Sequence, residues 1–399
     1  MFALLLAATL TLQHWEVRPD QLAAPRATPS SNNDPLVIAK PAGASLLLPG
    51  GFSIAPYATG LNTPRLMALA PNGDVFVTET FAGRVSVLRD SDHDGAIDQT
   101  FVFARSLREP FGIAFHDGFL YVANSDAVIR YPYTSGQTSA GGAAPTLIAS
   151  LPAGGGHSLR NLVFNPDGTK LFVGVGSTGN SSPESDSRRA AILVMNPDGG
   201  EQRIYASGLR NPSGLAIEPI TGSLWTAVNE RDLLGDDLVP DFVTSVVDGG
   251  FYGWPYSYAG KNVDPSVGNQ RPDLVAKALV PDVLLQAHSA SLGVVFYDGA
   301  MFPRDWNGDA FVALHGSWNR SRRTGYKVIR IPMQNGKPTG GYDDFVVGWS
   351  PDETARTVWG RPVGLLVLAD GSLLISDDGA GTIWRVTFKA PDRRRTATH

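Results

Sequence analysis

The chain has 399 residues, of which 44 are Gly and 29 are Pro, and 18% of the residues are charged. This composition suits many short strands joined by tight turns better than long helices, so an all-β fold is expected. A net charge of −5 gives no basis for nucleic-acid binding, which needs a basic surface. The absence of Cys excludes disulfides, thiol catalysis and thiolate metal sites.

The N-terminus begins with an apolar run at residues 1–13, which is too short to span a bilayer. We interpret it as a secretion signal, although it lacks the usual basic residues, and an uncleaved N-terminal anchor is the alternative. The stretch from Arg26 to Asp34 is rich in Pro, Ser and Asn and is predicted to be a disordered leader. A periplasmic or secreted protein is therefore expected, with no transmembrane span beyond the possible anchor.

One sequence pattern recurs six times along the chain. It comprises a turn with Arg or Pro, an apolar strand, a turn with Gly, a second apolar strand and a polar terminus. The copies begin at Pro64, Pro110, Ser158, Asn211, Ser291 and Arg361. Starts that are roughly 45 to 80 residues apart are typical of propeller blades with some long inserts. We therefore predict a six-bladed β-propeller over residues 36–390, after a signal or anchor and leader at 1–35 and before a flexible tail at 391–399. A generic β-meander is the alternative.

Circular closure removes the exposed sheet edges, and residues 46–57 are expected to join the last blade. The segments before the inner strands then gather at one end of the central channel. His157, Arg160, Arg210, Asn211 and Arg361 all lie in such segments. This repeated placement of Arg and His predicts a binding site, although each of these residues could instead cap a strand or pair with an acid.

A separate signal is the run of alternating aspartates in the first copy. Asp90, Asp92, Asp94 and Asp98, with Gly95 between them, resemble an abbreviated EF-hand loop. We predict a Ca²⁺ site there that serves stability rather than catalysis, and a metal-free turn is the alternative.

Several motifs resemble the soluble sugar dehydrogenases that depend on pyrroloquinoline quinone (PQQ). They are GGGHSLRNLVFNPDG around His157, GLRNPSGL around Arg210 and YGWP from Tyr252. The segments NERDLLGDDLVP from Asn229 and HGSWNR from His315 resemble the L-sorbosone dehydrogenase-like branch of that family. The likeness covers roughly residues 51–386.

This resemblance implies a PQQ-dependent oxidoreductase that acts on a sugar, polyol or sugar aldehyde and passes electrons to an external acceptor. His157 matches the general base of the family, a role that suits imidazole because its pKa lies near neutrality. The pair Arg210 and Asn211 matches cofactor-binding residues, and Arg361 matches an arginine that binds a cofactor carboxylate. Further cofactor contacts are expected at Arg108, Asn319 and Arg320.

The resemblance also implies a Ca²⁺ ion beside the quinone, bound by the backbone carbonyls of Asp232 and Leu233. Here the chain departs from the glucose enzymes, which have Gly-Pro at these positions and a lysine in place of the Ser-Trp-Asn-Arg segment. We expect His288 and Trp318 to face the substrate.

Two other functions remain open at this point. One is a Ca²⁺-dependent propeller lactonase, for which Glu79, Asn124 and Asn229 would supply ligands at the ends of second strands. The other is a non-enzymatic propeller that binds a partner, because the fold alone does not decide function.

Overall fold

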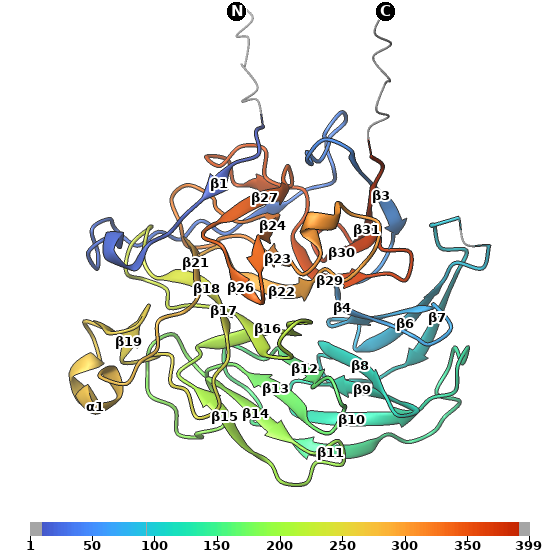
Figure 1. Ribbon diagram of the computed structural model, residues 1–399, viewed down its shortest axis with the longest axis horizontal. Helices are drawn as coiled ribbons and strands as arrows, with labels where there is room; N and C mark the ends of the chain where they lie inside the picture. Colours follow the sequence, from blue (N-terminus) through green and yellow to red (C-terminus); the bar gives the residue numbers. More distant parts are fainter. Residues whose placement is uncertain (1–9, 93, 391–399) are drawn as a thin grey trace, which may run out of the picture.

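Six antiparallel β-sheets form a ring in the computed structural model of the protein, which describes residues 10–92 and 94–390 (Figure 1). The predicted six-bladed β-propeller is confirmed. The first strand of each sheet lies nearest the centre of the ring, and the following strands lie progressively outward.

Each blade contains four strands in meander order; the sixth takes its fourth strand from the N-terminal part of the chain, and the fifth has an additional short strand from that part at its outer edge. The first three blades are β4 (Pro64–Leu69), β5 (Val75–Glu79), β6 (Arg84–Arg89) and β7 (Gln99–Ala104); β8 (Gly112–His116), β9 (Phe119–Ala123), β10 (Ala127–Pro132) and β11 (Thr146–Ser150); and β12 (Arg160–Phe164), β13 (Leu171–Val175), β14 (Ala191–Met195) and β15 (Arg203–Ser207). The last three are β16 (Asn211–Ile217), β17 (Leu224–Asn229), β18 (Pro240–Ser245) and β21 (Val283–Ala287); β22 (Ser291–Phe296), β23 (Ala310–Leu314), β24 (Lys327–Ile331) and β27 (Tyr342–Val346); and β29 (Pro362–Val367), β30 (Leu373–Asp377), β31 (Thr382–Phe388) and β3 (Phe52–Ala58).

The ring is closed by β3, which precedes the first blade in sequence and pairs with β31 of the sixth. Phe52 lies opposite Phe388, and Ala58 lies opposite Ile383. The expectation that residues 46–57 join the last blade is confirmed from Phe52 onward, whereas Leu47 pairs with Val347 beside the fifth blade. Because β3 lies in the sixth blade and the chain then continues into β4 of the first, the ring is closed and no blade is left with an open radial face.

Glycines in the inner strands allow neighbouring blades to approach closely. A Cβ at Gly293 would lie 2.2 Å from the backbone oxygen of Val363, and one at Gly364 would lie 2.4 Å from that of Arg65. These glycines occupy the middle of the repeated motif, as in SLGVVF and RPVGLL. The glycine of the motif is therefore needed for close contact between neighbouring blades around the channel.

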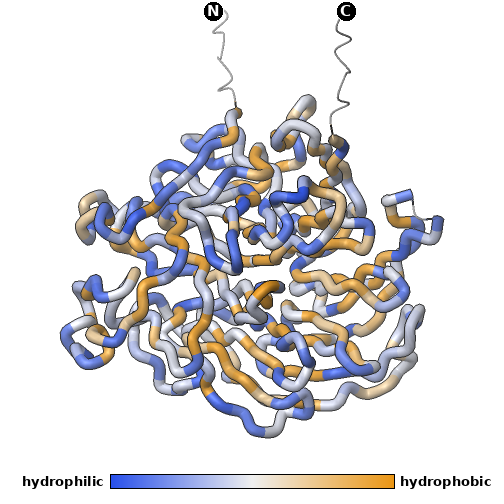
Figure 2. Tube along the Cα trace, viewed as in Figure 1, coloured by the Kyte–Doolittle hydropathy of each residue, from blue (hydrophilic) through white to orange (hydrophobic). Residues whose placement is uncertain are grey.

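Apolar side chains fill the space between blades, and Figure 2 shows hydrophobic stretches along their strands. The contact between the fifth and sixth blades is rich in aromatic residues, including the fully buried Phe345 and Trp349. Phe52 of the closing strand packs against Phe345 with ring centroids 5.2 Å apart. Closure is thus stabilised by burial of aromatic surface as well as by strand pairing.

The N-terminal strap, residues 10–37, follows the fourth and fifth blades. Within it, β1 (His14–Trp15) pairs with β27, and β2 (Leu36–Val37) pairs with β28 (Thr357–Val358). The backbone nitrogens of Arg26 and Asn33 donate to the oxygens of Leu234 and Trp318, both at 2.7 Å.

The prediction of a disordered leader is therefore wrong for the part that is described. The polar side chains that make its composition resemble a linker have partners in the blade loops, and composition cannot show those partners. Residues 1–9 of the expected signal and the expected tail at 391–399 lie outside the described residues.

Smaller elements decorate the loops of the last three blades and the N-terminal strap. They are η1 (Pro19–Gln21), β19 (Ser257–Tyr258), β20 (Asn262–Val263), η2 (Gly268–Gln270), α1 (Pro272–Val275), η3 (Arg304–Trp306), β25 (Met333–Gln334) and β26 (Lys337–Pro338). Within residues 10–92 and 94–390, none of the helices has the length and apolar character needed to cross a membrane.

Candidate functional site

A cavity of about 400 Å³ lies where the starts of inner strands meet the ends of second strands. Antiparallel pairing places these two kinds of segment side by side, so residues from several blades converge there. The lining includes these predicted site residues: His157, Arg210, Asn211, Asp232, His288, Trp318, Asn319 and Arg361. The convergence expected from the repeats is thus present in the structure.

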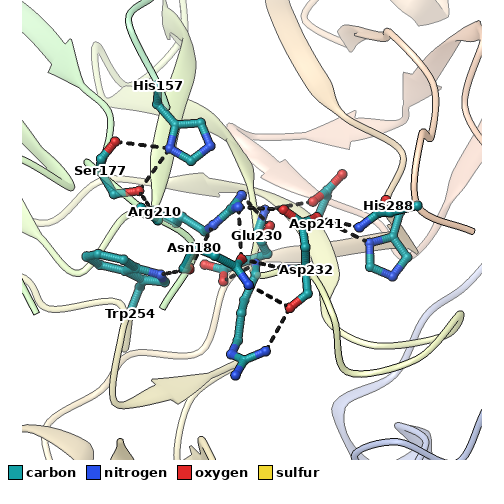
Figure 3. Close-up of polar contacts among 12 residues, drawn as sticks. His157, Ser177, Asn180, Arg210, Glu230, Asp232, Asp241, Trp254 and His288 are labelled. Atoms are coloured by element: carbon teal, nitrogen blue, oxygen red, sulfur yellow. Dashed lines mark hydrogen bonds and ion pairs between the residues drawn. The ribbon is translucent and has the colours of Figure 1, made fainter. Parts of the chain in front are cut away.

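His157 lies in the loop before β12, and Ser177, just after β13, orients its ring (Figure 3). Nδ1 lies 3.1 Å from the backbone oxygen and 2.9 Å from the hydroxyl oxygen of Ser177. Because a carbonyl oxygen can only accept, Nδ1 carries the ring proton and Nε2 keeps a free lone pair. Burial, followed by the charge of Arg210, lowers the pKa of His157 to about 4. The ring is therefore a neutral base at neutral pH.

Two buried arginines fix the glycine-rich loop that carries His157. Arg160 donates to the backbone oxygens of His157 at 2.7 Å and Pro152 at 2.9 Å. Arg189 donates to the oxygens of residues 153 and 154 at 2.6 and 2.7 Å. Burial, together with the charge of Arg189, lowers the pKa of Arg160 to about 10. Arg160 thus holds the loop from within, rather than facing the cavity.

Arg210 is the centre of a hydrogen-bond network on the side of the fourth blade (Figure 3). Its Nε and Nη2 donate to the backbone oxygen and Oδ1 of Asn180 at 3.1 and 3.0 Å. Nη1 donates to the backbone oxygen of Glu230, and Nη2 also pairs with the Asp232 carboxylate, both at 2.6 Å. All three nitrogens are thus engaged within the protein. A bidentate grip on a cofactor carboxylate, as expected from the family, would have to replace some of these bonds.

Asn211, next in sequence, has an acceptor that no described residue satisfies. Its Oδ1 is buried and has no hydrogen-bond partner among the described residues, and the residue is 6% exposed. Gly176 leaves room for it, since a Cβ there would lie 2.5 Å from that oxygen. An unsatisfied buried acceptor costs about 1–3 kcal/mol, so this atom suits a ligand that donates a hydrogen bond.

Three carboxylates line the same side of the cavity as Arg210. Burial raises the pKa of Glu230 to about 8 and that of Asp241 to about 6. Burial would raise the pKa of Asp232 too, but Arg210 and His288 outweigh it and lower this pKa to about 2. His288 also donates from Nε2 to the backbone oxygen of Gly235 at 2.9 Å. Asp232 therefore stays ionised, whereas the neighbouring Glu230 and Asp241 are protonated more readily.

The carbonyls predicted to bind Ca²⁺ are placed less favourably than the carboxylates. The backbone oxygen of Asp232 accepts from Asn180 at 3.0 Å and from Arg231 at 2.7 Å, which uses both lone pairs. Leu233 is not among the residues that line the cavity. A hard cation here would find its oxygen ligands more readily in the carboxylates of Glu230 and Asp241, because that of Asp232 is already paired with Arg210.

Arg361 lies on the opposite side of the channel, before β29 of the sixth blade. Its Nε and Nη2 donate to the backbone oxygens of His315 and Gly316, both at 3.2 Å. Burial lowers the pKa of its guanidinium. Nearby, Arg65 pairs with Asp378 at 3.0 Å. This wall therefore carries two arginines and one carboxylate, and it suits an anionic group of a ligand.

The loop after β23 contributes the remaining predicted contacts. Asn319 lines the cavity and donates to the Asp232 carboxylate at 2.7 Å. Trp318 is 40% exposed and lines the cavity as well. Arg320 lies outside the lining and donates to the backbone oxygen of Asp236 at 3.0 Å. The predicted cofactor contact by Arg320 has no geometric support.

Two other predicted residues lie away from the cavity. The side chain of Arg108 is 66% exposed and pairs with Asp126 at 3.0 Å. Glu79, considered as a lactonase ligand, accepts from Nε and Nη2 of Arg84 at 2.7 and 2.8 Å and is not part of the lining. A carboxylate so paired is poorly placed to hold a channel cation.

The aspartate loop joins β6 to β7 in the first blade, outside the cavity. Oxygens of Asp90, Asp92 and Asp98 lie within 4.8 Å of one another, and they form one such acidic group among the described residues. Asp94 does not belong to the group, and its Oδ1 accepts from the backbone nitrogen of Ala96 at 2.8 Å. The Ca²⁺ site stays a prediction, with three rather than four converging aspartates.

Reasoning from the sequence missed several residues that line or support the cavity: Arg65, Glu230, Asp241, His315 and Asp378. The repeat itself contained a signal for four of them. Arg65 lies beside Pro64, where the first copy begins, and Glu230, His315 and Asp378 directly follow second strands. Comparing copies position by position would have found them, whereas Asp241 lies in a third strand, outside the repeat.

Comparison with known proteins gives the same picture. The family model described as Glucose / Sorbosone dehydrogenase matches residues 61–318, and one described as TrAA12-like matches residues 248–389. A Borreliella burgdorferi protein of uncharacterised function is 28% identical over 86% of this chain and 91% of its own. The pyrroloquinoline quinone-dependent pyranose dehydrogenase of Coprinopsis cinerea is 28% identical over 84% of this chain, which spans only 53% of that protein.

Solved structures share the fold. The PQQ domain of the Coprinopsis cinerea enzyme has a TM-score of 0.75 at 23% identity and covers 86% of this chain and 97% of its own. A Trichoderma reesei enzyme of carbohydrate-active family AA12 has a TM-score of 0.75 at 21% identity, with 90% and 100% covered. Since the family model spans well over half of the sequence, the chain belongs to the glucose/sorbosone dehydrogenase family.

Proposed function

We propose that the protein is a PQQ-dependent dehydrogenase that oxidises a hydroxyl of a sugar or polyol, or a hydrated sugar aldehyde. The observation that carries the proposal is His157: a neutral imidazole in the cavity lining, with Nδ1 engaged by Ser177 and Nε2 free. Membership of the family and the names of the PQQ-dependent relatives support the same reaction class.

His157, Ser177 and Trp318 have different roles in the proposed oxidation. Nε2 of His157 accepts the proton of the substrate hydroxyl, and the Ser177 carbonyl, which already accepts from Nδ1, stabilises the imidazolium that forms. PQQ, when bound with Ca²⁺, supplies the acceptor for the hydride that leaves the substrate carbon. Trp318 offers an exposed aromatic face at the cavity, a surface on which a sugar ring can pack.

The cavity fits such a cofactor in its chemistry. Arg361 and Arg65 suit the carboxylates of PQQ, and Oδ1 of Asn211 is a buried acceptor without a described donor. Glu230 and Asp241 would hold the cation on the side of the fourth blade.

The first experiment asks about the cofactor before the substrate. Purified protein is titrated with PQQ in the presence of Ca²⁺, and uptake is followed by absorbance. Aldoses and sorbosone are then offered with an artificial electron acceptor. We expect saturable uptake followed by reduction of the acceptor. A protein that takes up no PQQ would refute the proposal and favour a binding propeller.

The second experiment tests the base. His157→Ala should keep PQQ affinity and lose about 100-fold or more in kcat, because general-base catalysis contributes about that much. His14→Ala is the matched control, because His14 lies on the surface outside the cavity. Full activity of the His157 variant would remove the base from the mechanism.

The proposal also covers the location of the protein, its electron acceptor and its branch of the family. We place the protein in the periplasm or outside the cell, with a separate electron acceptor, on the strength of the apolar N-terminus. Fractionation with an antibody to the native protein tests the location. The sorbosone-like branch is favoured by the segments at Asn229 and His315, and the ratio of kcat/KM for sorbosone to that for glucose tests it.

A further inference from the structure

A second histidine, His315, lines the cavity on the wall formed by the fifth, sixth and first blades. It directly follows β23, and its Nε2 lies 2.9 and 3.0 Å from the two carboxylate oxygens of Asp378. Because a carboxylate can only accept, Nε2 carries the proton and Nδ1 has the lone pair. Nδ1 makes no hydrogen bond to a residue within the described part of the chain.

Three further contacts hold His315 in this orientation. Arg65 pairs with Asp378 at 3.0 Å and fixes the carboxylate. Arg361 donates to the backbone oxygen of His315 at 3.2 Å, and the backbone nitrogen of His315 donates to Ala290 at 2.9 Å. The side chains of His315 and Asp378 are only 13% and 8% exposed. A ring that is held from its side chain and its backbone presents Nδ1 in one direction.

Burial, helped by the neighbouring arginines, keeps His315 neutral. Burial, followed by the charge of Arg361, lowers its pKa to about 4, although Asp378 acts in the opposite direction. Burial would raise the pKa of Asp378, but His315 and Arg65 outweigh it and hold that pKa far below its usual range. An imidazolium would add a third positive charge beside two arginines. Nδ1 is therefore a hydrogen-bond acceptor next to a cation.

We propose that Nδ1 of His315 binds a hydrogen-bond donor of a molecule in the cavity, and that Asp378 and Arg65 are positioning residues that fix its tautomer. The matching chemistry is an N–H or O–H donor beside an oxygen-rich or anionic group. The pyrrole N–H of PQQ, which adjoins a carboxylate, and a sugar hydroxyl both have it. The identity of these ligands rests on the proposed function, whereas the tautomer does not.

The tautomer is tested on the PQQ-free protein by ¹⁵N NMR of the histidine rings. We expect His315 to be protonated at Nε2 and bare at Nδ1. In Asp378→Asn, the amide can donate to the ring, so a substantial fraction should shift the proton to Nδ1. Asp343→Asn is the matched control, because Asp343 pairs with the exposed His14 at 2.8 Å. A wild-type His315 protonated at Nδ1 would overturn the proposal.

Binding is tested with PQQ titrations and steady-state kinetics of His315→Ala and His315→Asn. Loss of one hydrogen bond in a buried site should weaken binding about tenfold in the Ala variant. The Asn variant, whose amide oxygen can replace Nδ1, should recover part of the loss. A higher Kd for PQQ identifies the cofactor as the donor, whereas an unchanged Kd with a higher KM identifies the sugar.

Two results separate this proposal from the proposed function. If neither Kd nor KM changes more than twofold in the Ala variant, while its urea midpoint stays that of the wild type, Nδ1 binds nothing and the proposal is wrong. If the wild type itself takes up no PQQ, the proposed function fails, and the nitrogen spectra still decide the tautomer of His315.

Discussion

The low pKa of His157 has a measurable consequence for stability. Its pKa falls from 6.5 to about 4 in the folded protein because the ring is buried and lies close to Arg210. The folded state therefore binds this proton less readily than the unfolded chain does. The associated stability is fully present above pH 6.5 and is lost as the pH falls through about 4.

The size of this effect follows from the two pKa values. A difference of 2.5 between 6.5 and about 4 corresponds to about 3 kcal/mol of unfolding free energy below pH 4, of which about 2 kcal/mol is lost by pH 5. A His157→Gln variant has no imidazole to protonate, so it does not lose this unfolding free energy as the pH falls. Relative to the wild type, the variant should thus gain about 2 kcal/mol between pH 7.5 and pH 5.

Urea unfolding at the two pH values measures the difference directly. His14→Gln controls for the substitution itself, because that side chain is 59% exposed. NMR titration of the His157 ring in the PQQ-free protein gives the pKa independently. A variant whose offset from the wild type is the same at both pH values, or a ring that titrates near 6.5, would show that His157 is not the buried neutral base described above.

Three further outcomes are expected. Arg210→Met should lower the unfolding free energy by about 3–5 kcal/mol, measured in urea, because it leaves the Asp232 carboxylate buried without its ion pair; an unchanged midpoint would contradict the network. Gly293→Ala should lower the melting temperature by several degrees, since its Cβ would lie 2.2 Å from a backbone oxygen of the next blade, whereas Gly50→Ala, with nothing within 4 Å, should not. Ca²⁺ should raise the melting temperature of the PQQ-free wild type more than that of Asp92→Asn; an equal rise would argue against the aspartate loop as a Ca²⁺ site.

The candidate functional site could be predicted only in part. The repeat placed His157, Asn211 and Arg361 at equivalent blade positions, and the structure brings all three to one cavity. It could not show that Arg210 donates to Asn180, Glu230 and Asp232, because those partners come from other loops. For the same reason the free lone pairs of His157 and His315 were invisible, since each depends on what the other ring nitrogen contacts.

Sequence by itself determined the blade number and the turn positions, because these depend on local periodicity and on turn residues that act within a few positions. Tertiary structure alone decided the course of the N-terminal strap. A segment with the composition of a linker is held there by contacts such as that of Asn33 with Trp318, nearly 300 residues away. Tertiary structure likewise decided which cationic side chains face the cavity and which bond only to other parts of the protein, because charge and exposure depend on neighbours that are distant in the chain.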